Sequence, residues 1–208
     1  MPSSPLARPN DAARPREDAE SVRDVGLLYE RHAADVARWA ARLGGRSLDV
    51  EDLVHQVFLV AQRKVGSFRG EARITTWLHG ITVRVVQEAR RRQRRWWRWP
   101  GPGAAHDELG ETGRDEASLL SEEPSALALL EKKEAQRTVY AILDRLDEKY
   151  RTVLVLFELE GLSGEEVAVI TQTSLSNVWV RLLRARKQFL RRLSQHEAQS
   201  GRESRGAR

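Results

Sequence analysis

Apolar residues recur at helical spacing in three segments of the first half of the chain. The first segment spans 21–43 and stops at Gly44-Gly45, because paired glycines end helices. Asp49 is suited to cap a second helix, and a third helix is expected from Ile74 to Arg95. The residues predicted to face inward are Val25, Leu28, Tyr29, His32, Val36, Trp39, Ala40, Leu43, Leu53, Val54, Val57, Phe58, Val60, Ala61, Trp77, Leu78, Ile81 and Val85. This pattern predicts a helical domain at 21–99.

A second helical domain is expected at 126–194. Apolar stripes run from Val139 to Leu159, and Gly161 ends them. Ser163 and Glu166 match a capping box for a short helix, and Ser174 is suited to cap a last helix that reaches about Leu193. A short helix, a polar turn and a longer helix are typical of the helix-turn-helix. The predicted core face of the last helix consists of Leu175, Val178, Leu182, Ala185 and Phe189.

The remaining segments lack apolar periodicity. Residues 1–20 and 195–208 are expected to be disordered tails, and 100–125 is expected to be a flexible acidic linker that starts at a Pro-Gly-Pro-Gly run. A linker of about 25 residues reaches ~80 Å when extended. The predicted fold class is therefore all-α, with two small helical domains joined by a flexible linker.

Composition excludes several classes of protein. The 208 residues include no cysteine, which rules out disulfide frameworks, thiolate zinc sites and cysteine nucleophiles. No apolar run approaches the roughly 20 residues that cross a bilayer, and the first 20 residues lack the apolar core of a secretory signal. We therefore expect a cytoplasmic protein without membrane insertion. We recognise no nucleophile–base pair and no complete metal shell, so neither an enzyme nor a cofactor is predicted.

Charge is distributed unevenly around a formal net charge of +5. Residues 84–98 carry seven arginines and one acid, whereas 107–123 carry seven acids and one arginine. Trp96, Trp97 and Trp99 follow the arginines, and guanidinium groups with exposed indoles suit nucleic acid through phosphate contacts and base stacking. Two alternatives stay open: the tryptophans pack against the second domain or a partner protein, or they lie at a membrane surface.

Several local sequences resemble the extracytoplasmic-function group of the sigma-70 family. In the first domain, Asp49–Phe58 resembles the polymerase-binding helix, and Phe68–Glu71 with Thr76–Leu78 resembles the loop and helix that melt the promoter. In the second domain, the similar segments are Leu146–Leu156, Glu160–Ala168, Val178 and Arg181–Arg186, the last two matching the recognition helix. The resemblance covers 21–193 except the linker, and the order and spacing of its parts make it specific.

The resemblance implies a sigma factor that binds core RNA polymerase at the clamp and the flap, recognises and melts promoter DNA, and has an anti-sigma factor as a further partner. The implied polymerase-binding residues are Glu51, Asp52, His55 and Gln56. The implied contacts to the downstream promoter element are Phe68, Arg69, Arg84, Arg91, Arg92, Arg94 and Arg95. The implied recognition-helix contacts are Ser176, Asn177, Trp179, Val180, Leu183, Arg184 and Lys187.

The chain departs from the family pattern at several positions. Val83-Arg84 stands where the family usually has Arg-Asn, Gly80 replaces a larger residue, and Gln172-Thr173 occupies a turn that usually holds glycine and an apolar residue. Apolar side chains at Trp179, Val180 and Leu183 replace polar or basic base readers. These three side chains have three interpretations: they contact thymine methyl groups, they bind a protein, or the assumed helix phase is wrong by one residue.

Other interpretations also stay open. Glu51, Asp52 and His55 share helical spacing and form a polymerase-docking face, a solvated face or part of a metal site. Phe68 either anchors its loop or lines a base pocket. For the whole chain, the rivals to a sigma factor are a stand-alone helix-turn-helix transcription regulator and a sigma-like interaction protein that has lost upstream-element reading.

Overall fold

The computed structural model describes residues 24–68, 70, 72–98 and 126–206. Every regular element in these ranges is helical, which confirms the all-α class. The elements are α2 (Val25–Gly44), α3 (Val50–Lys64), the short 3-10 helix η1 (Val65–Ser67), α4 (Ile74–Arg98), α5 (Ala126–Asp144), α6 (Glu148–Leu154), the π-helical turn η2 (Val155–Leu159), α7 (Gly164–Thr171) and α8 (Leu175–Gly206). The segments predicted at 1–20 and 100–125 lie outside the described residues, as do Arg69 and Trp99.

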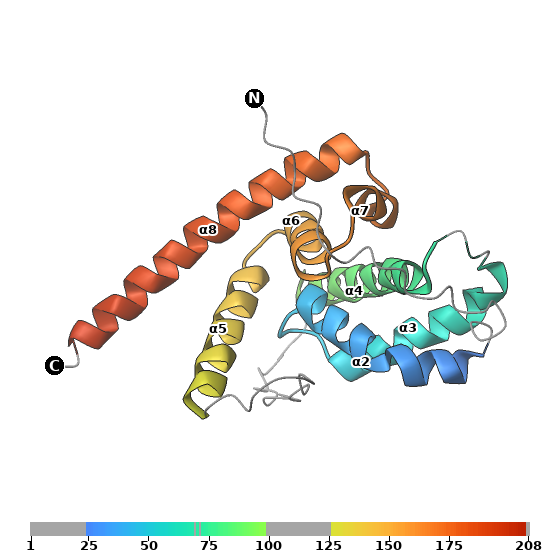
Figure 1. Cartoon of the computed structure of the whole chain (residues 1–208), viewed down its shortest axis with the longest axis horizontal. Coiled ribbons are helices and arrows are strands. Elements are labelled where there is room, and N and C mark those ends of the chain that lie inside the picture. Colours follow the sequence, from blue (N-terminus) through green and yellow to red (C-terminus); the bar gives the residue numbers. More distant parts are fainter. Residues whose placement is uncertain (1–23, 69, 71, 99–125, 207–208) are drawn as a thin grey trace.

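We call α2–α4 the first module and α5–α8 the second module. Figure 1 shows α2, α3 and α4 grouped on one side of the molecule, α6 and α7 next to α4, and the long α8 projecting on the other side. Within the described residues, no helix is long and apolar enough to cross a membrane.

Side-chain caps determine where the first-module helices begin. The carboxylate of Asp24 accepts a hydrogen bond from the backbone N–H of Gly26 at 2.8 Å. As predicted, Asp49 caps α3, accepting from the N–H of Asp52 at 3.0 Å. Each cap satisfies a donor that has no partner inside the helix, so the helix start is encoded locally.

The predicted inward stripes of the first module are largely buried. Val36, Val57 and Leu78 are completely buried where the three helices meet. Tyr29 is the clear exception, because it is 49% exposed and presents its ring edge to Phe58 at 4.8 Å between centroids. Tyr29 therefore covers the margin of the core, where the phenol group stays in contact with water.

The second module contains the predicted helix-turn-helix, formed by α7 and α8. The capping box is present: the Ser163 N–H donates to Glu166 Oε2 at 2.9 Å, and the Glu166 N–H donates to Ser163 Oγ at 3.2 Å. Ser174 caps α8 by accepting from the N–H of Asn177 at 3.3 Å. Gln172 adopts the left-handed conformation (φ 52°) between the two helices, which explains why a glycine is typical of this turn.

Helix α8 differs from the expected element at its far end. The helix continues to Gly206, past the end expected near Leu193, so the C-terminal tail expected at 195–208 is helical over most of its length. Residues such as Gln195, Glu197 and Ala198 have adequate helix propensity, and no proline interrupts them. Low apolar content was therefore a poor guide to where this helix ends.

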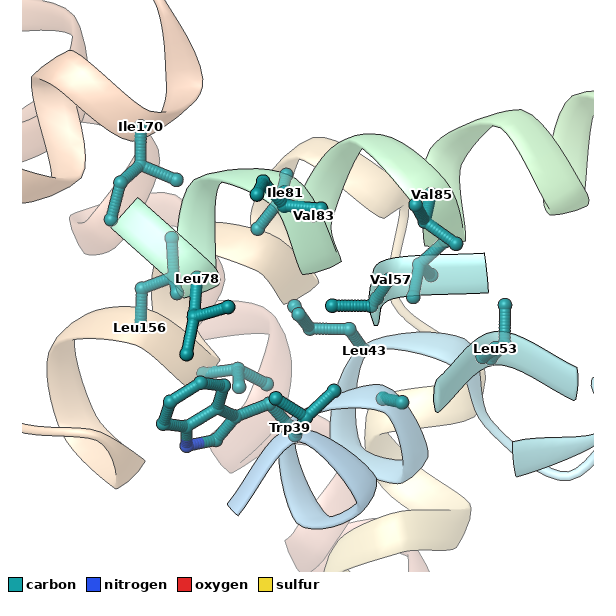
Figure 2. Close-up of a cluster of buried hydrophobic side chains, with 14 of the residues drawn as sticks. Trp39, Leu43, Leu53, Val57, Leu78, Ile81, Val83, Val85, Leu156 and Ile170 are labelled. Carbon is teal, nitrogen blue, oxygen red and sulfur yellow. The ribbon is translucent and has the colours of Figure 1, made fainter. Parts of the chain in front are cut away.

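The buried side chains of the two modules form one continuous core. Figure 2 shows Leu156 and Ile170 of the second module beside Leu78 and Ile81 of α4. Val83, which stands at one of the positions where the chain departs from the family pattern, is 2% exposed and belongs to this core. Helix α4 therefore buries side chains against helices of both modules. The apolar patterns predict two separate domains and do not indicate this contact between them.

Gly80 lies inside α4 without a steric reason for being a glycine. A Cβ atom placed there has no neighbouring heavy atom within 4 Å. Alanine is favoured over glycine in helix interiors, so we expect Gly80→Ala to raise the free energy of unfolding by about 0.5–1 kcal/mol. Urea unfolding measures this change. As a control, Gly45→Ala should lower stability, because Gly45 has φ 75° and its Cβ would collide with Asp144. Destabilisation by Gly80→Ala would contradict the expected result.

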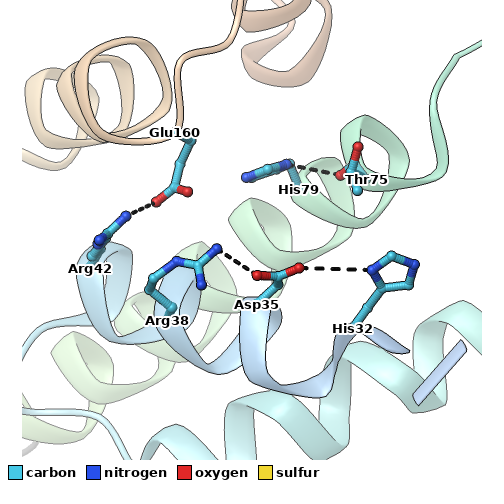
Figure 3. A network of polar contacts seen from close by, with 7 residues as sticks. All are labelled: His32, Asp35, Arg38, Arg42, Thr75, His79 and Glu160. Carbon is cyan, nitrogen blue, oxygen red and sulfur yellow. Dashed lines mark hydrogen bonds and ion pairs between the residues drawn. The ribbon is translucent and has the colours of Figure 1, made fainter. Parts of the chain in front are cut away.

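The imidazole of His79 is buried in the shared core. It is 4% exposed and stacks on Trp39, with 3.6 Å between ring centroids. Its Nδ1 lies 2.9 Å from the Thr75 carbonyl oxygen, which can only accept, so Nδ1 carries the proton (Figure 3). Nε2 has no hydrogen-bond partner among the described residues. Burial lowers the pKa of His79 from 6.5 to about 4.

This lowered pKa predicts a loss of stability in acid. The unfolded chain takes up the His79 proton below pH 6.5, whereas the folded chain resists it until about pH 4. The contribution of neutral His79 is thus complete above pH 6.5 and is lost as the pH falls toward 4. From roughly pH 7 to pH 5, we expect the wild-type chain to lose about 2 kcal/mol more stability than His79→Phe. Urea unfolding at both pH values tests this, and equal losses would refute it.

Candidate polymerase-binding and nucleic-acid-binding surfaces

Helix α3 presents an acidic face to solvent at its N-terminal end. Glu51, Asp52 and His55 are exposed and Gln56 is half-buried, while Leu53, Val54 and Val57 point into the core. The Asp49 cap holds the first turn in place, so the two carboxylates project from a rigid helix start. Among the described residues, no group of three His, Asp or Glu side chains is arranged to hold a metal ion. The two exposed carboxylates are complementary to a cationic protein surface.

Phe68 connects the loop before α4 to that helix. Its half-buried ring lies against Trp77, with 5.3 Å between ring centroids. Ser67 Oγ also donates to the Lys64 carbonyl at 2.7 Å, which tightens the end of η1. The contact with Trp77 favours an anchoring role for Phe68. Because the Phe68 ring is partly exposed, its binding of a promoter base stays a prediction.

From Arg84 onward, α4 forms a cationic surface. Arg84, Arg91, Arg92, Arg94 and Arg95 are all exposed. Glu88 pairs with Arg91 and with Arg95, each at 3.4 Å, and Arg94 pairs with Glu148 of α6, also at 3.4 Å. Exposed pairs of this kind contribute about 0–1 kcal/mol, so phosphate groups can replace the carboxylates at little cost.

Trp96 extends the cationic surface with a large apolar side chain. Its indole is 75% exposed, and it lines a shallow hollow together with Ala89, Arg92, Gln93 and Arg95. An indole flanked by two guanidinium groups suits a nucleotide, whose base stacks while its phosphate is neutralised. The side chains of Trp97 and Trp99 lie outside the described residues.

Arg90 differs from its neighbours in the arginine run. It is half-buried, and its Nη2 donates to the carbonyl oxygen of Gly44 at 3.0 Å. Burial lowers the pKa of Arg90, and the positive charge of Arg151 adds to the effect. Arg90 therefore closes the end of α2 and is a structural residue. In the sequence, nothing distinguishes Arg90 from the exposed arginines that follow it.

The recognition face of α8 is exposed as predicted. Ser176, Asn177, Trp179, Val180, Leu183, Arg184 and Lys187 all lie on the solvent side. Val178, Leu182 and Ala185 are completely buried on the other side, which eliminates the interpretation that the helix phase is wrong. Leu175, predicted to be core, is instead 37% exposed because it lies in the first turn.

Trp179 has a packing role that the sequence pattern did not reveal. Its ring meets Phe157 edge-on, with 5.4 Å between centroids. It also covers Gly164, where an added Cβ would lie 2.7 Å from the Trp179 ring. Trp179 thus positions α8 against η2 and α7, and the glycine in the first turn of α7 is the sequence signal that marks this close approach. Leu183, which is 70% exposed, remains the most accessible apolar side chain of the recognition face.

Comparison with known families matches both modules. Residues 28–96 match the sigma-70 region 2 model and residues 136–189 match the sigma-70 region 4 model. The ECF RNA polymerase sigma-E factor of Escherichia coli strain K12 is 31% identical over 161 residues, covering 77% of this chain and 82% of that protein. The sigma-E factor of Haemophilus influenzae is 32% identical over 163 residues, with the same coverage.

Solved structures share the fold. CnrH in complex with the cytosolic domain of CnrY has a TM-score of 0.58 and 23% identity, covering 86% of this chain and 96% of CnrH. The sigma factor RpoE in complex with the anti-sigma factor NepR from Bartonella quintana has a TM-score of 0.60 and 19% identity, covering 83% and 98%. The sequence relatives and the two matched regions together establish the family. The chain therefore belongs to the extracytoplasmic-function group of the sigma-70 family, the sigma factors that serve RNA polymerase in promoter recognition and transcription initiation.

Proposed function

We propose that the two modules divide the work of initiation between polymerase binding and DNA binding. The acidic face of α3 docks on the clamp of core polymerase, and Phe68 with the cationic surface of α4 binds the downstream promoter element. The second module binds the polymerase flap and places α8 on the upstream element. The observation that carries this proposal is the pairing of a region 2 module, bearing exposed arginines, with a region 4 module whose recognition face is exposed.

We propose that this work is done in the cytoplasm by binding alone, with no catalytic step and no cofactor. Melting requires that the protein prefer an unstacked base to a stacked one, and extruding a base costs a few kcal/mol. Stacking on an aromatic side chain returns about 1–3 kcal/mol per base. Among the described side chains of α4 and of the loop before it, Phe68 and Trp77 are partly exposed and Trp96 is exposed, and these aromatic residues suit this task.

An anti-sigma factor is a proposed additional partner. The two similar solved structures are a complex with CnrY and a complex with the anti-sigma factor NepR. We propose that a protein of this class also holds the present chain away from polymerase until a signal releases it.

A second candidate function rests on the recognition face. Val180 and Leu183 are exposed apolar residues that can contact thymine methyl groups, but exposed apolar clusters also mark protein-binding surfaces. A sigma-like interaction protein without upstream reading is therefore the alternative.

Promoter selection with reconstituted holoenzyme tests the proposed function. Run-off transcription from a randomised promoter library should yield specific transcripts that share an upstream and a downstream element. Absence of any specific transcript would favour the interaction protein. Tight duplex binding by the isolated chain, without polymerase, would instead favour a stand-alone transcription regulator.

The docking role of Asp52 gives a separate prediction. Asp52→Asn removes the charge while keeping the shape, so the exposed position should tolerate it without unfolding. We expect affinity for core polymerase to fall about ten-fold, or ~1.4 kcal/mol. Glu30→Gln, an equivalent change at an exposed position of α2, is the control. Titration of labelled chain with core polymerase measures both, and wild-type affinity in Asp52→Asn would remove the docking assignment.

A further inference from the structure

Helix α8 carries a second line of apolar side chains besides the face that packs into the core. Its members are between 37% and 70% exposed and are Leu175, Trp179, Leu183 and Leu190. Their spacings of four, four and seven residues place them on one face of the helix. This face is separate from the buried face that contains Val178, Leu182 and Ala185. We call the four exposed residues the outer stripe.

The outer stripe is more than the second module needs to hold α8 in place, because the buried face already packs into the core. Single exposed apolar residues are common on protein surfaces. A helix with apolar residues on a second face as well, however, is normally covered on that face too. Trp179 is partly covered by Phe157 and Gly164, whereas Leu183 and Leu190 keep most of their surface in water. The outer stripe is therefore a surface suited to contact with another molecule.

DNA does not account for the full length of the outer stripe. The N-terminal residues of a recognition helix are the ones that contact base edges, and the major groove is about 12 Å wide. Leu190 lies about 22 Å beyond Leu175 along the helix axis, at ~1.5 Å per residue. Figure 1 shows that this part of α8 projects away from α6 and α7. An apolar side chain placed there gains nothing from phosphate groups, so Leu190 favours a protein as the covering molecule.

The charge of α8 specifies the chemistry of that protein. Between Leu175 and His196, the helix contains six arginine and lysine residues and no acidic residue. Lys187 is exposed next to the outer stripe, and Arg186 forms an ion pair with Glu158 of η2, so a carboxylate is already accommodated at its edge. A symmetric dimer uses the same patch on both copies and would bring two cationic faces together. Charge complementarity therefore favours an acidic partner over a second copy of this chain.

We propose that the outer stripe is the docking site of a protein partner that presents an acidic amphipathic helix. Such helices dock through apolar anchors three, four or seven residues apart, which are spacings that the outer stripe also offers. The apolar anchors of the partner pack against Leu183 and Leu190, and its carboxylates lie near Lys187 and Arg191. Trp179 and Leu183 also belong to the recognition face, so the bound partner excludes the upstream element from α8. The exclusion rests on the proposed function, whereas the docking site does not.

Peptide selection against the full chain tests the docking site. The probe is a displayed library of helical peptides with leucines fixed at heptad spacing and all flanking positions randomised. Enriched peptides should contain more Asp and Glu than Lys and Arg. The double variant Leu183→Gln with Leu190→Gln should weaken their binding at least about ten-fold. Leu27→Gln, at an exposed position of α2, is the matched control and should leave binding unchanged.

Two further measurements keep this test independent of folding. Glutamine has good helix propensity, and circular dichroism checks that each variant keeps its helix content. An enriched peptide whose acidic residues are replaced by glutamine and asparagine should also bind the wild-type chain at least about ten-fold more weakly. Failure to enrich any peptide, enrichment without an excess of acids, or equal binding to the double variant would each overturn the docking site.

Leu190→Gln separates a protein partner from DNA. Holoenzyme that carries this variant should bind a selected promoter within about two-fold of the wild-type affinity, because Leu190 lies beyond the groove, while the chain loses affinity for the peptide. A loss of promoter affinity of about ten-fold would assign the outer stripe to DNA and overturn the proposal. Saturating peptide should displace the promoter from wild-type holoenzyme, and unchanged promoter binding would overturn the exclusion. Wild-type holoenzyme that binds no promoter would instead overturn the proposed function, whatever the peptide result.

Discussion

Replacing Arg91, Arg92, Arg94 and Arg95 together with alanine is expected to weaken promoter binding by the holoenzyme and to flatten its salt dependence. All four side chains are exposed on one half of α4, and their carboxylate partners are held by weak surface pairs. Each phosphate contact contributes a slope of about −0.9 in log affinity against log salt. Loss of four contacts should therefore reduce the slope by up to ~3.6.

The measurement is fluorescence anisotropy of a labelled promoter fragment across a range of salt concentrations. Alanine at Arg63 and Lys64, two exposed cations at the end of α3, serves as the control for a general loss of positive charge. Thermal unfolding of each variant confirms that the helices are retained. A slope equal to that of the wild-type protein would show that the four arginines do not contact phosphate.

Replacing Arg151 with alanine is expected to produce the largest loss of stability of any single substitution considered. The guanidinium group is 1% exposed and joins Asp144 to the end of α2, so its removal leaves both partners unsatisfied and opens a cavity. Breaking a buried ion pair costs about 3–5 kcal/mol. Because Asp144 keeps 26% of its side-chain surface exposed, we expect a value near the lower end, about 3 kcal/mol.

Urea unfolding monitored by circular dichroism measures this loss. Arg145→Ala, which removes an exposed arginine between α5 and α6, should change stability by no more than about 0.5 kcal/mol. The double variant Asp144→Ala with Arg151→Met should lose less than Arg151→Ala, because it leaves no uncompensated charge and refills the cavity. A loss below about 1 kcal/mol in Arg151→Ala would contradict the structural role assigned to Arg151.

Local signals in the sequence predicted most helix starts and the buried faces. Asp49, Ser163 and Ser174 were recognisable as caps because each satisfies backbone donors within three residues. The apolar period placed Val178, Leu182 and Ala185 in the core and left the recognition face outside. The order of the motifs also predicted the family, since each motif is a short stretch whose residues are adjacent in the chain.

Residues that act across the boundary between the modules were not predictable in this way. Arg90 and Arg151 look like other arginines in the sequence, yet both bind carbonyl oxygens at the end of α2. The sequence offered Trp179 as a contact to DNA or to a partner protein and gave no sign that its ring packs over Gly164. These roles depend on partners far away in the chain, and neither periodicity nor composition carries that information.

The amino-acid sequence by itself therefore determined the helices, their inward faces, the cationic end of α4 and the sigma-factor family. Helix starts and inward faces arise from hydrogen bonds and apolar spacing within one or two turns, so neighbouring residues are sufficient to specify them. The arginines of α4 and the family motifs are likewise short stretches of residues that are adjacent in the chain. Only the tertiary structure decided which arginines are exposed and which are buried, and that α4 of the first module also packs against the second module. Burial and pairing depend on elements brought together from positions more than a hundred residues apart, as in the contacts of Arg42 with Glu160 and Arg151.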